Sequence, residues 1–239
     1  MLRTLARRRF LTHISTGAVV TPWWLSGGIP AANCIAAFQP KGAASLAASY
    51  VNLASGGATW DAAPGDAPGF NTATGWDFNG SSDYLIVGSG AIATAAPLSM
   101  VCRFNVDVGA ALGVFMSICN TSSANRFQFY FADQDEVIMA TVATAAGAAN
   151  STAGFLFGGW YSGFGVTSAA NSRAAYINGA NKGTDATSLT PSGVNATYIG
   201  ARYSGASIGS FLNGKMSHCA FYNIALSDAQ ALVLHAAMV

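Results

Sequence analysis

The sequence predicts an all-β protein, an antiparallel β-sandwich with a short C-terminal helix and an N-terminal arm. Three observations carry this prediction. Short segments of alternating apolar and polar residues recur along the chain, and turn residues separate them about every ten residues. Asn-Gly pairs follow several of these segments, and both residues of such a pair tolerate the positive φ angles of tight turns. The length of 239 residues suits one large sandwich domain.

The first third of the chain mixes strand patterns with irregular sequence. The apolar run at residues 34–38 predicts a first strand, and the alternation at residues 49–53 predicts a second. Gly and Pro recur through residues 54–70, which predicts an irregular surface connection. Residues 75–78 and 84–87 flank Asn79-Gly80, and this arrangement predicts a hairpin.

The middle of the chain carries the clearest strand patterns. Period-two alternation predicts strands at several successive segments, and Phe127, Phe129 and Phe131 share one face of one of them. The predicted strands of this region are residues 98–106, 113–119, 126–131, 137–144, 155–160 and 162–167. The phenylalanine face predicts a large part of the core.

The last third contains further strands and one helix. Strands are predicted at residues 173–178, 197–200 and 215–222. Ser227 and Gln230 have the spacing of a capping box, so the helix is predicted to begin at Asp228 and to end near residue 236. Leu232, Leu234 and Ala236 are predicted to face the sandwich.

Composition excludes two classes of partner. Charged residues make up 9% of the chain and the formal net charge is +1, whereas an ordinary globular protein has about 25% charged residues. Apart from Arg7-Arg8-Arg9 no basic patch occurs, so we predict no nucleic-acid binding. No run of 18 apolar residues occurs, so no membrane span is predicted. A net charge this small gives little repulsion between copies of the chain, which favours a subunit of a larger assembly. An ordinary Ala- and Gly-rich bacterial composition explains the low charge equally well.

Residues 1–32 are interpreted as an arm, and residues 33–239 as the sandwich. Arg7-Arg8-Arg9-Phe10-Leu11 resembles a twin-arginine export motif, but the following stretch is only weakly apolar and Pro22 interrupts it. We therefore prefer an ordered arm to an export signal. Trp23 and Trp24 are candidate anchors on a neighbouring molecule, and packing against their own sandwich is the alternative.

Several motifs resemble one family of sandwich domains. Residues 78–85 read Phe-Asn-Gly-Ser-Ser-Asp-Tyr-Leu, similar to the F-[DN]-G-x-x-D-Y motif of laminin-G-like, concanavalin A-like domains. The C-terminal half of such domains is similar to Trp160-Tyr161, Tyr176-Ile177-Asn178-Gly179, Ile199-Gly200, Phe211-Leu212-Asn213-Gly214-Lys215-Met216 and Phe221-Tyr222-Asn223-Ile224-Ala225-Leu226-Ser227-Asp228. The resemblance covers about two-thirds of the chain and implies a concanavalin A-like jelly roll.

The N-terminal sequence adds a functional expectation. Residues 22–29 and 39–45 resemble the N-termini of laminin-G-like proteins encoded in phage genomes. This resemblance implies a non-enzymatic virion structural protein, a capsid decoration, fibre or spike component at the virion surface. Its partners would be other virion proteins, copies of itself and host-surface glycans. The alternative is a secreted bacterial carbohydrate-binding protein, and a divergent polysaccharide hydrolase ranks third.

We predict no enzyme and no catalytic, cofactor-binding or metal-binding residue. Glycoside hydrolysis needs two carboxylates, and the E-x-D-x-x-E motif of related glucanases is absent from a chain whose single Glu is Glu136. His13, His218 and His235 accompany no candidate nucleophile, and no G-x-S-x-G elbow occurs. No cofactor is expected.

The acidic cluster Asp133-Gln134-Asp135-Glu136 is interpreted as a solvated turn rather than a calcium site. Relatives often carry Asp-Glu after G-K-I, where this chain has Ser217-His218, so no role of that acidic pair transfers here.

Four cysteines lack any C-x-x-C pair, and we interpret them as small buried hydrophobic residues. They are Cys34, Cys102, Cys119 and Cys219. A disulfide between facing strands stays open.

Exposed aromatic residues are the candidates for sugar binding, because an aromatic ring can stack on the apolar face of a sugar ring. Four of them fall in or near Gly-rich segments, namely Trp60, Tyr161, Phe164 and Tyr203. The alternative is that each covers an edge of the sandwich, which is the role expected for Trp160.

Overall fold

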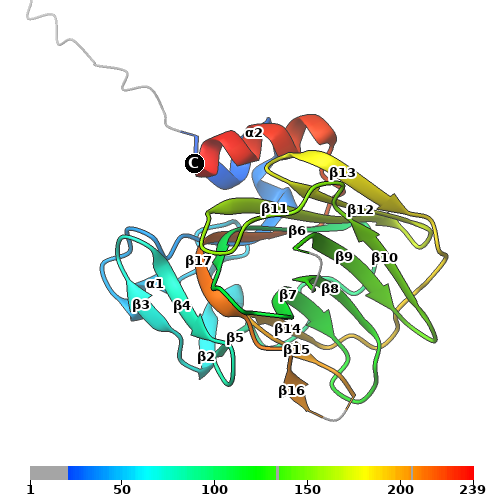
Figure 1. Cartoon of the computed structure of the whole chain (residues 1–239), viewed down its shortest axis with the longest axis horizontal. Coiled ribbons are helices and arrows are strands. Elements are labelled where there is room, and N and C mark those ends of the chain that lie inside the picture. The colour runs from blue at the N-terminus through cyan, green and yellow to red at the C-terminus, as the bar shows by residue number, and fades with distance from the viewer. Residues whose placement is uncertain (1–20, 133–134, 206) are drawn as a thin grey trace, which may run out of the picture.

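The structure is a computed structural model that describes residues 21–132, 135–205 and 207–239. Two antiparallel sheets stack face to face, as Figure 1 shows, and the predicted β-sandwich with a short C-terminal helix is confirmed. Sheet A contains, in spatial order, β13 (Ala180–Asp185), β12 (Ser172–Ile177), β11 (Tyr161–Ala169), β6 (Leu98–Val106), β17 (Asn213–Tyr222), β4 (Gly75–Asn79) and β3 (Gly69–Asn71). In addition, β1 (Cys34–Phe38) pairs with the C-terminal half of β17.

Sheet B lies opposite sheet A. It contains, in spatial order, β10 (Ala146–Asn150), β9 (Val137–Val142), β8 (Arg126–Phe131), β7 (Gly113–Cys119), β14 (Ala196–Ile199), β5 (Tyr84–Val87) and β2 (Ala62–Asp66). A two-stranded ribbon of β15 (Arg202–Tyr203) and β16 (Ile208–Gly209) lies on the side of sheet B that faces away from sheet A (Figure 1).

The core between the sheets is rich in phenylalanine. Phe127, Phe129 and Phe131 all point into it, as their alternation predicts. Gly163 and Gly165 in β11 make room for the Phe129 ring, because a Cβ atom at Gly163 would lie 2.7 Å from the ring. This close approach explains why β11 carries glycine at core positions, where glycine otherwise weakens a strand.

The helix α2 (Asp228–Met238) packs on the outer face of sheet A together with the short 3₁₀ helix η1 (Trp23–Leu25). The capping box is confirmed: Ser227 Oγ accepts from Gln230 N, and Gln230 Oε1 accepts from Ser227 N. The predicted buried stripe is wrong in part, because Ala231, Leu234 and Met238 face the sheet while Leu232 is 55% exposed. Gly179 lets the Asn178-Gly179 turn approach the helix backbone closely, because a Cβ atom there would lie 2.7 Å from the Ala231 carbonyl oxygen.

Trp23 and Trp24 pack against the chain's own sandwich. The Trp23 side chain is buried in a cluster with Val101, Phe164 and other residues of sheet A and α2. Tyr222 Oη donates a 3.0 Å hydrogen bond to the Trp24 carbonyl oxygen. Residues 1–20 of the predicted arm, with Arg7-Arg8-Arg9 and His13, lie outside the described residues. Among the helices that are described, none has the length and apolarity needed to cross a membrane.

The hairpin predicted at Asn79-Gly80 is wrong. Strand β4 belongs to sheet A and β5 to sheet B, so the turn carries the chain from one sheet to the other. The Asn79 side-chain oxygen accepts hydrogen bonds from the backbone N–H groups of Ser81, Ser82 and Asp83. This Asx-type arrangement satisfies the backbone N–H groups of the turn, so the turn does not need hydrogen bonds between the flanking strands.

Two other predicted strands are absent. Residues 49–53 begin at the last residue of a short helix, α1 (Leu46–Ser49), and continue as a turn rather than a strand. The N-cap of this helix is Ser45, whose side chain accepts a hydrogen bond from Ala48 N. Residues 155–160 are a turn as well, with Phe155 buried in the core. In both places the backbone is irregular, but its aromatic and apolar side chains still reach the core. Their spacing in the sequence is similar to the alternation of a strand.

Two short 3₁₀ helices complete the secondary structure, η2 (Ala31–Asn33) before β1 and η3 (Gly57–Trp60) before β2. The region of residues 54–70, predicted as irregular, contains the edge strands β2 and β3.

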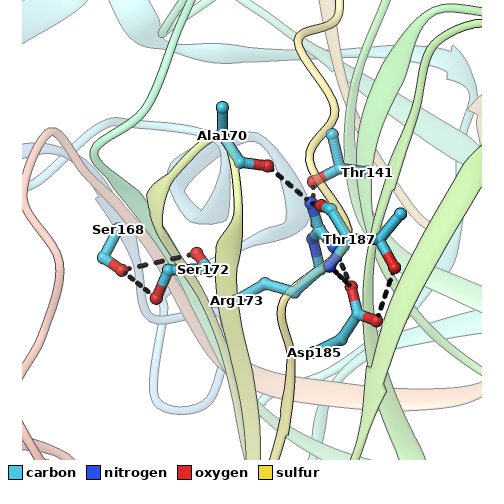
Figure 2. A network of polar contacts seen from close by, with 7 residues as sticks. All are labelled: Thr141, Ser168, Ala170, Ser172, Arg173, Asp185 and Thr187. Carbon is cyan, nitrogen blue, oxygen red and sulfur yellow. Dashed lines mark hydrogen bonds and ion pairs between the residues drawn. The ribbon is translucent and has the colours of Figure 1, made fainter.

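A buried arginine ties the two sheets together at one edge (Figure 2). Arg173 in β12 is 2% exposed, and its guanidinium forms an ion pair with Asp185 of β13. The same group donates to Thr141 Oγ1 of β9, to the Ala170 carbonyl and to the Thr187 carbonyl. Arg173 therefore connects two strands of sheet A, one strand of sheet B and the loop after β13.

Candidate functional site

The positively charged side chains fall into two groups. Among the described residues, Arg173, Lys182 and Lys215 form ion pairs with aspartates. The other four described Lys and Arg residues form no ion pair there, and they gather at two places on opposite faces of the sandwich. Arg126 and Arg202 lie outside sheet B, and Lys41 and Arg103 lie outside sheet A.

The first pair is positioned by strand alternation. Because Phe127 and Phe129 of β8 face the core, Arg126, Gln128 and Tyr130 point to the outer face of sheet B. Arg202 comes from β15 in the ribbon that crosses this face. The ribbon is held there by Ser117 Oγ, which donates a 2.8 Å hydrogen bond to the Ala201 carbonyl.

The two guanidinium groups converge on one neutral acceptor. Arg126 Nε donates to Gln128 Oε1 at 2.6 Å, and Arg202 Nη1 donates to the same oxygen at 2.8 Å. The Arg202 Nε atom is buried and lacks a hydrogen-bond partner within the residues that the structure describes. Gln128 itself is buried, so its amide holds the two arginines side by side.

This arrangement concentrates positive charge at a half-buried place. Burial lowers the pKa of Arg126, and repulsion from neighbouring Arg202 lowers it further. Burial raises the pKa of Tyr130, so its phenol stays a neutral hydrogen-bond donor at neutral pH. Like charges held together without a counter-charge are unfavourable, and an anion bound between them would relieve the repulsion.

Aromatic side chains continue from the arginines along the same face. Tyr203 adjoins Arg202 in β15 and is half-buried. Tyr84 packs against Tyr198 and against Phe211, each at a centroid distance of 6.2 Å. Burial raises the pKa of Tyr198, and Tyr84 and Tyr203 lie near enough to add to that rise. We call the set Arg126, Gln128, Tyr130, Arg202 and Tyr203 the arginine–tyrosine face.

Of the four aromatic residues predicted from sequence, Tyr203 lies on this face and the other three lie elsewhere. Trp60 in η3 is half-buried against the core. Tyr161 packs on Phe104 and Phe155, and its hydroxyl accepts from Leu156 N. Phe164 is fully buried in the cluster beneath α2. The two arginines were not predicted, because no local sequence pattern shows whether a cation has an acidic partner.

The remaining candidates form no shared site in the described structure. Glu136 Oε2 accepts a 2.9 Å hydrogen bond from Asn150 Nδ2, while Asp133 lies outside the described residues. No group of three or more His, Cys, Asp or Glu residues suited to a metal occurs in the described part of the chain. The four cysteines are buried and unpaired, although Cys102 and Cys219 are direct neighbours on β6 and β17.

Comparison with known families gives one match. The model Laminin_G_3, described as the Concanavalin A-like lectin/glucanases superfamily, matches residues 79–231, which is more than half of the chain. The comparison with curated protein sequences gave no match.

Solved structures share the fold at low sequence identity. The CBM40 of the Ruminococcus gnavus IT-sialidase bound to α2,3-sialyllactose has a TM-score of 0.52 at 13% identity, over 58% of this chain and 82% of that chain. The binding domain of botulinum neurotoxin serotype D has a TM-score of 0.62 at 12% identity, over 86% of this chain and 52% of that chain. The SAP-like pentraxin of Limulus polyphemus has a TM-score of 0.51 at 16% identity, over 69% and 77%. These likenesses concern the fold alone.

Proposed function

This chain belongs to the Concanavalin A-like lectin/glucanases superfamily, and from that premise we propose that it is a non-enzymatic carbohydrate-binding protein whose arginine–tyrosine face binds acidic glycans. The observation that carries the proposal is the pair Arg126 and Arg202, which share one neutral acceptor and form no ion pair within the described residues. A binding role is favoured over catalysis because this face gathers hydrogen-bond donors and aromatic rings, and glycoside hydrolysis uses two carboxylates.

The chemistry of an acidic sugar fits these side chains. A guanidinium presents its N–H groups in a planar fork that matches the two oxygens of a carboxylate. The carboxylate of a sugar such as a sialic acid would accept from the guanidinium groups of Arg126 and Arg202. Tyr203 would offer an aromatic surface to the sugar ring, and Tyr130 a hydroxyl donor. The sialyllactose bound by the R. gnavus module is a glycan of this class, and it supports the choice of ligand to test.

Replacing both arginines by glutamine should abolish acidic-glycan binding at the arginine–tyrosine face. We expect the wild-type chain to bind sialyllactose at least about tenfold more tightly than lactose, because hydrogen bonds to charged groups are worth about 1.5–3 kcal/mol. In the variant R126Q/R202Q the sialyllactose binding that belongs to this face should disappear. Isothermal titration calorimetry with both sugars measures it.

The matched control for this experiment is K182Q, which removes a cation from an exposed ion pair on β13. It should bind as the wild type does. Equal affinity of the wild type for sialyllactose and lactose, or wild-type binding by R126Q/R202Q, would refute the proposed face.

For the biological setting we propose a place outside the bacterial cell. Our main hypothesis is a secreted carbohydrate-binding protein, which was the second-ranked prediction from the sequence. The virion reading is the second candidate, supported by the phage-like segments at residues 22–29 and 39–45 and by the net charge of +1. Sedimentation of the purified full chain tests it: a virion subunit should form defined oligomers, and a free lectin should stay a monomer or small oligomer.

A further inference from the structure

The second pair of unpaired cations lies on the opposite side of the molecule. Because Cys102 and Phe104 of β6 face the core, Arg103 points to the outer face of sheet A. Its guanidinium lies over the Trp160 ring, 5.9 Å from the ring centroid. A hollow of about 60 Å³ is lined by Lys41, Ala73, Arg103, Trp160 and Ser217.

A larger hollow adjoins this one. It has a volume of about 490 Å³ and is lined by Thr21, Pro22, Trp23, Trp24, Ser26, Gln39, His218 and Ala237. Ser217 and His218 are consecutive residues of β17, so each contributes to the wall of one hollow. We call the two together the tryptophan hollow. Its larger part has the volume of an ordinary small-molecule site, about 300–1,000 Å³.

The walls combine aromatic surface with donors. The Trp23 ring stands edge-on to Trp24 at 5.9 Å and edge-on to His218 at 5.2 Å. The Trp23 Nε1 atom is buried and has no acceptor among the described residues. An indole N–H is a donor only, and it usually finds a partner when buried. Trp24 is half-buried and is therefore the ring of this pair that a ligand in the hollow can contact.

Positive charge prevails at this site as well. Neither Lys41 nor Arg103 forms an ion pair in the described part of the chain. Both act on His218, whose pKa is lowered to about 4, first by burial and then by these two cations. A carboxylate in the hollow would neutralise this charge, and the half-buried rings of Trp24 and Trp160 would pack on the sugar that carries it.

We propose that the tryptophan hollow is a second acidic-sugar site, and that each chain is bivalent and bridges two acidic glycans. The proposal rests on the proposed function of the arginine–tyrosine face. The two sites lie outside different sheets, with the whole sandwich between them; in Figure 1, α2 marks the side of one and the β15–β16 ribbon the side of the other. One sugar residue therefore cannot reach both sites, and binding at both joins two glycan segments.

Calorimetry on the full chain tests the number of sites. With sialyllactose we expect two sites per wild-type chain, one site in K41Q/R103Q, one site in R126Q/R202Q, and loss of binding in the quadruple variant. All variants exchange half-buried or exposed side chains, and thermal unfolding confirms that each is folded before it is titrated.

Agglutination tests the bridging. Beads coated with a sialylated polymer should be aggregated by wild-type chain that sedimentation shows to be monomeric, and by neither double variant. K182Q again serves as the control and should aggregate the beads.

The outcomes separate the two proposals. If K41Q/R103Q matches the wild type and one site is lost in R126Q/R202Q alone, the second site is refuted and the proposed function stands. If binding is lost in K41Q/R103Q and unchanged in R126Q/R202Q, the tryptophan hollow is supported as a binding site, while the proposed face and bivalency are refuted. Absence of any binding refutes both proposals.

Discussion

Replacing Arg173 by methionine is expected to lower the free energy of unfolding by about 3–5 kcal/mol, the usual effect of removing one partner of a buried ion pair. Arg173 is 2% exposed, and its hydrogen bonds reach a side chain or carbonyl on each neighbouring segment (Figure 2). Methionine fills a similar volume but leaves Asp185 without its cation. It also leaves the carbonyls of Ala170 and Thr187 without this donor.

Asp185, the partner of Arg173, is only partly shielded from water, which limits the loss of unfolding free energy in R173M. The Asp185 side chain is 21% exposed and keeps its hydrogen bonds from Thr187 N and Thr187 Oγ1. Urea unfolding measures the change, and thermal unfolding should show a decrease of about 10 °C in Tm. Replacing both partners, in R173M/D185L, should restore part of the stability, because a buried pair exchanged for apolar residues is often nearly neutral.

The matched control is the exposed ion pair on the neighbouring strand. Lys182 and Asp228 have side chains that are 39% and 70% exposed, so K182M should cost less than about 1 kcal/mol. If R173M proved no more destabilising than K182M, the buried network would not hold the sheet edges together.

The strands that sequence predicts best are those with an apolar side chain at every second position. Residues 84–87, 98–106, 113–119 and 126–131 are strands in the structure with these same bounds. In residues 84–87, 98–106 and 126–131 the alternation is complete because one face of each strand fills the core. In residues 113–119 a bulge between Val114 and Met116 interrupts it, and Phe115 and Met116 both face the core.

Edge strands were missed for the opposite reason. Strand β10 has the sequence Ala-Gly-Ala-Ala-Asn and β13 has Ala-Asn-Lys-Gly-Thr-Asp, neither of which alternates clearly. Such strands form because a neighbour offers hydrogen bonds, and this information is absent from their own residues. Gly183 shows the constraint: a Cβ atom there would lie 1.5 Å from the Asn150 carbonyl oxygen, since β13 crosses β10 closely.

The candidate site was predictable only in its aromatic part. Tyr203 stood out as an aromatic residue near glycines, and it lies on the arginine–tyrosine face. The charged part depends on contacts between distant segments, because 74 positions separate Gln128 from Arg202. Whether an arginine meets an aspartate or another arginine is decided by the fold, so the sequence pattern around Arg126 carries no sign of it.

Acidification is expected to destabilise the protein through His218. The His218 side chain is 6% exposed and packs edge-on against Trp23, and its Nδ1 lies 2.9 Å from Ser217 Oγ. Burial, with smaller contributions from Arg103 and Lys41, lowers its pKa from 6.5 to about 4 in the folded chain. Between these two values the unfolded chain binds a proton that the folded chain excludes, so stability falls as the pH falls.

The magnitude follows from that pKa difference. A shift of this size corresponds to a loss of about 3 kcal/mol between pH 7 and pH 4, because each pKa unit is worth about 1.4 kcal/mol. Urea unfolding of wild-type protein and H218Q across this range measures it, and the quantity to compare is the slope of unfolding free energy against pH. The slope should be much shallower in H218Q, whatever the variant's stability at pH 7. Burial also lowers the pKa of His235, but that residue is common to both proteins, so its contribution cancels in the difference. Parallel curves for the two proteins would mean that His218 accepts its proton in the folded state as readily as in the unfolded one, and that the tryptophan hollow does not shield it from water.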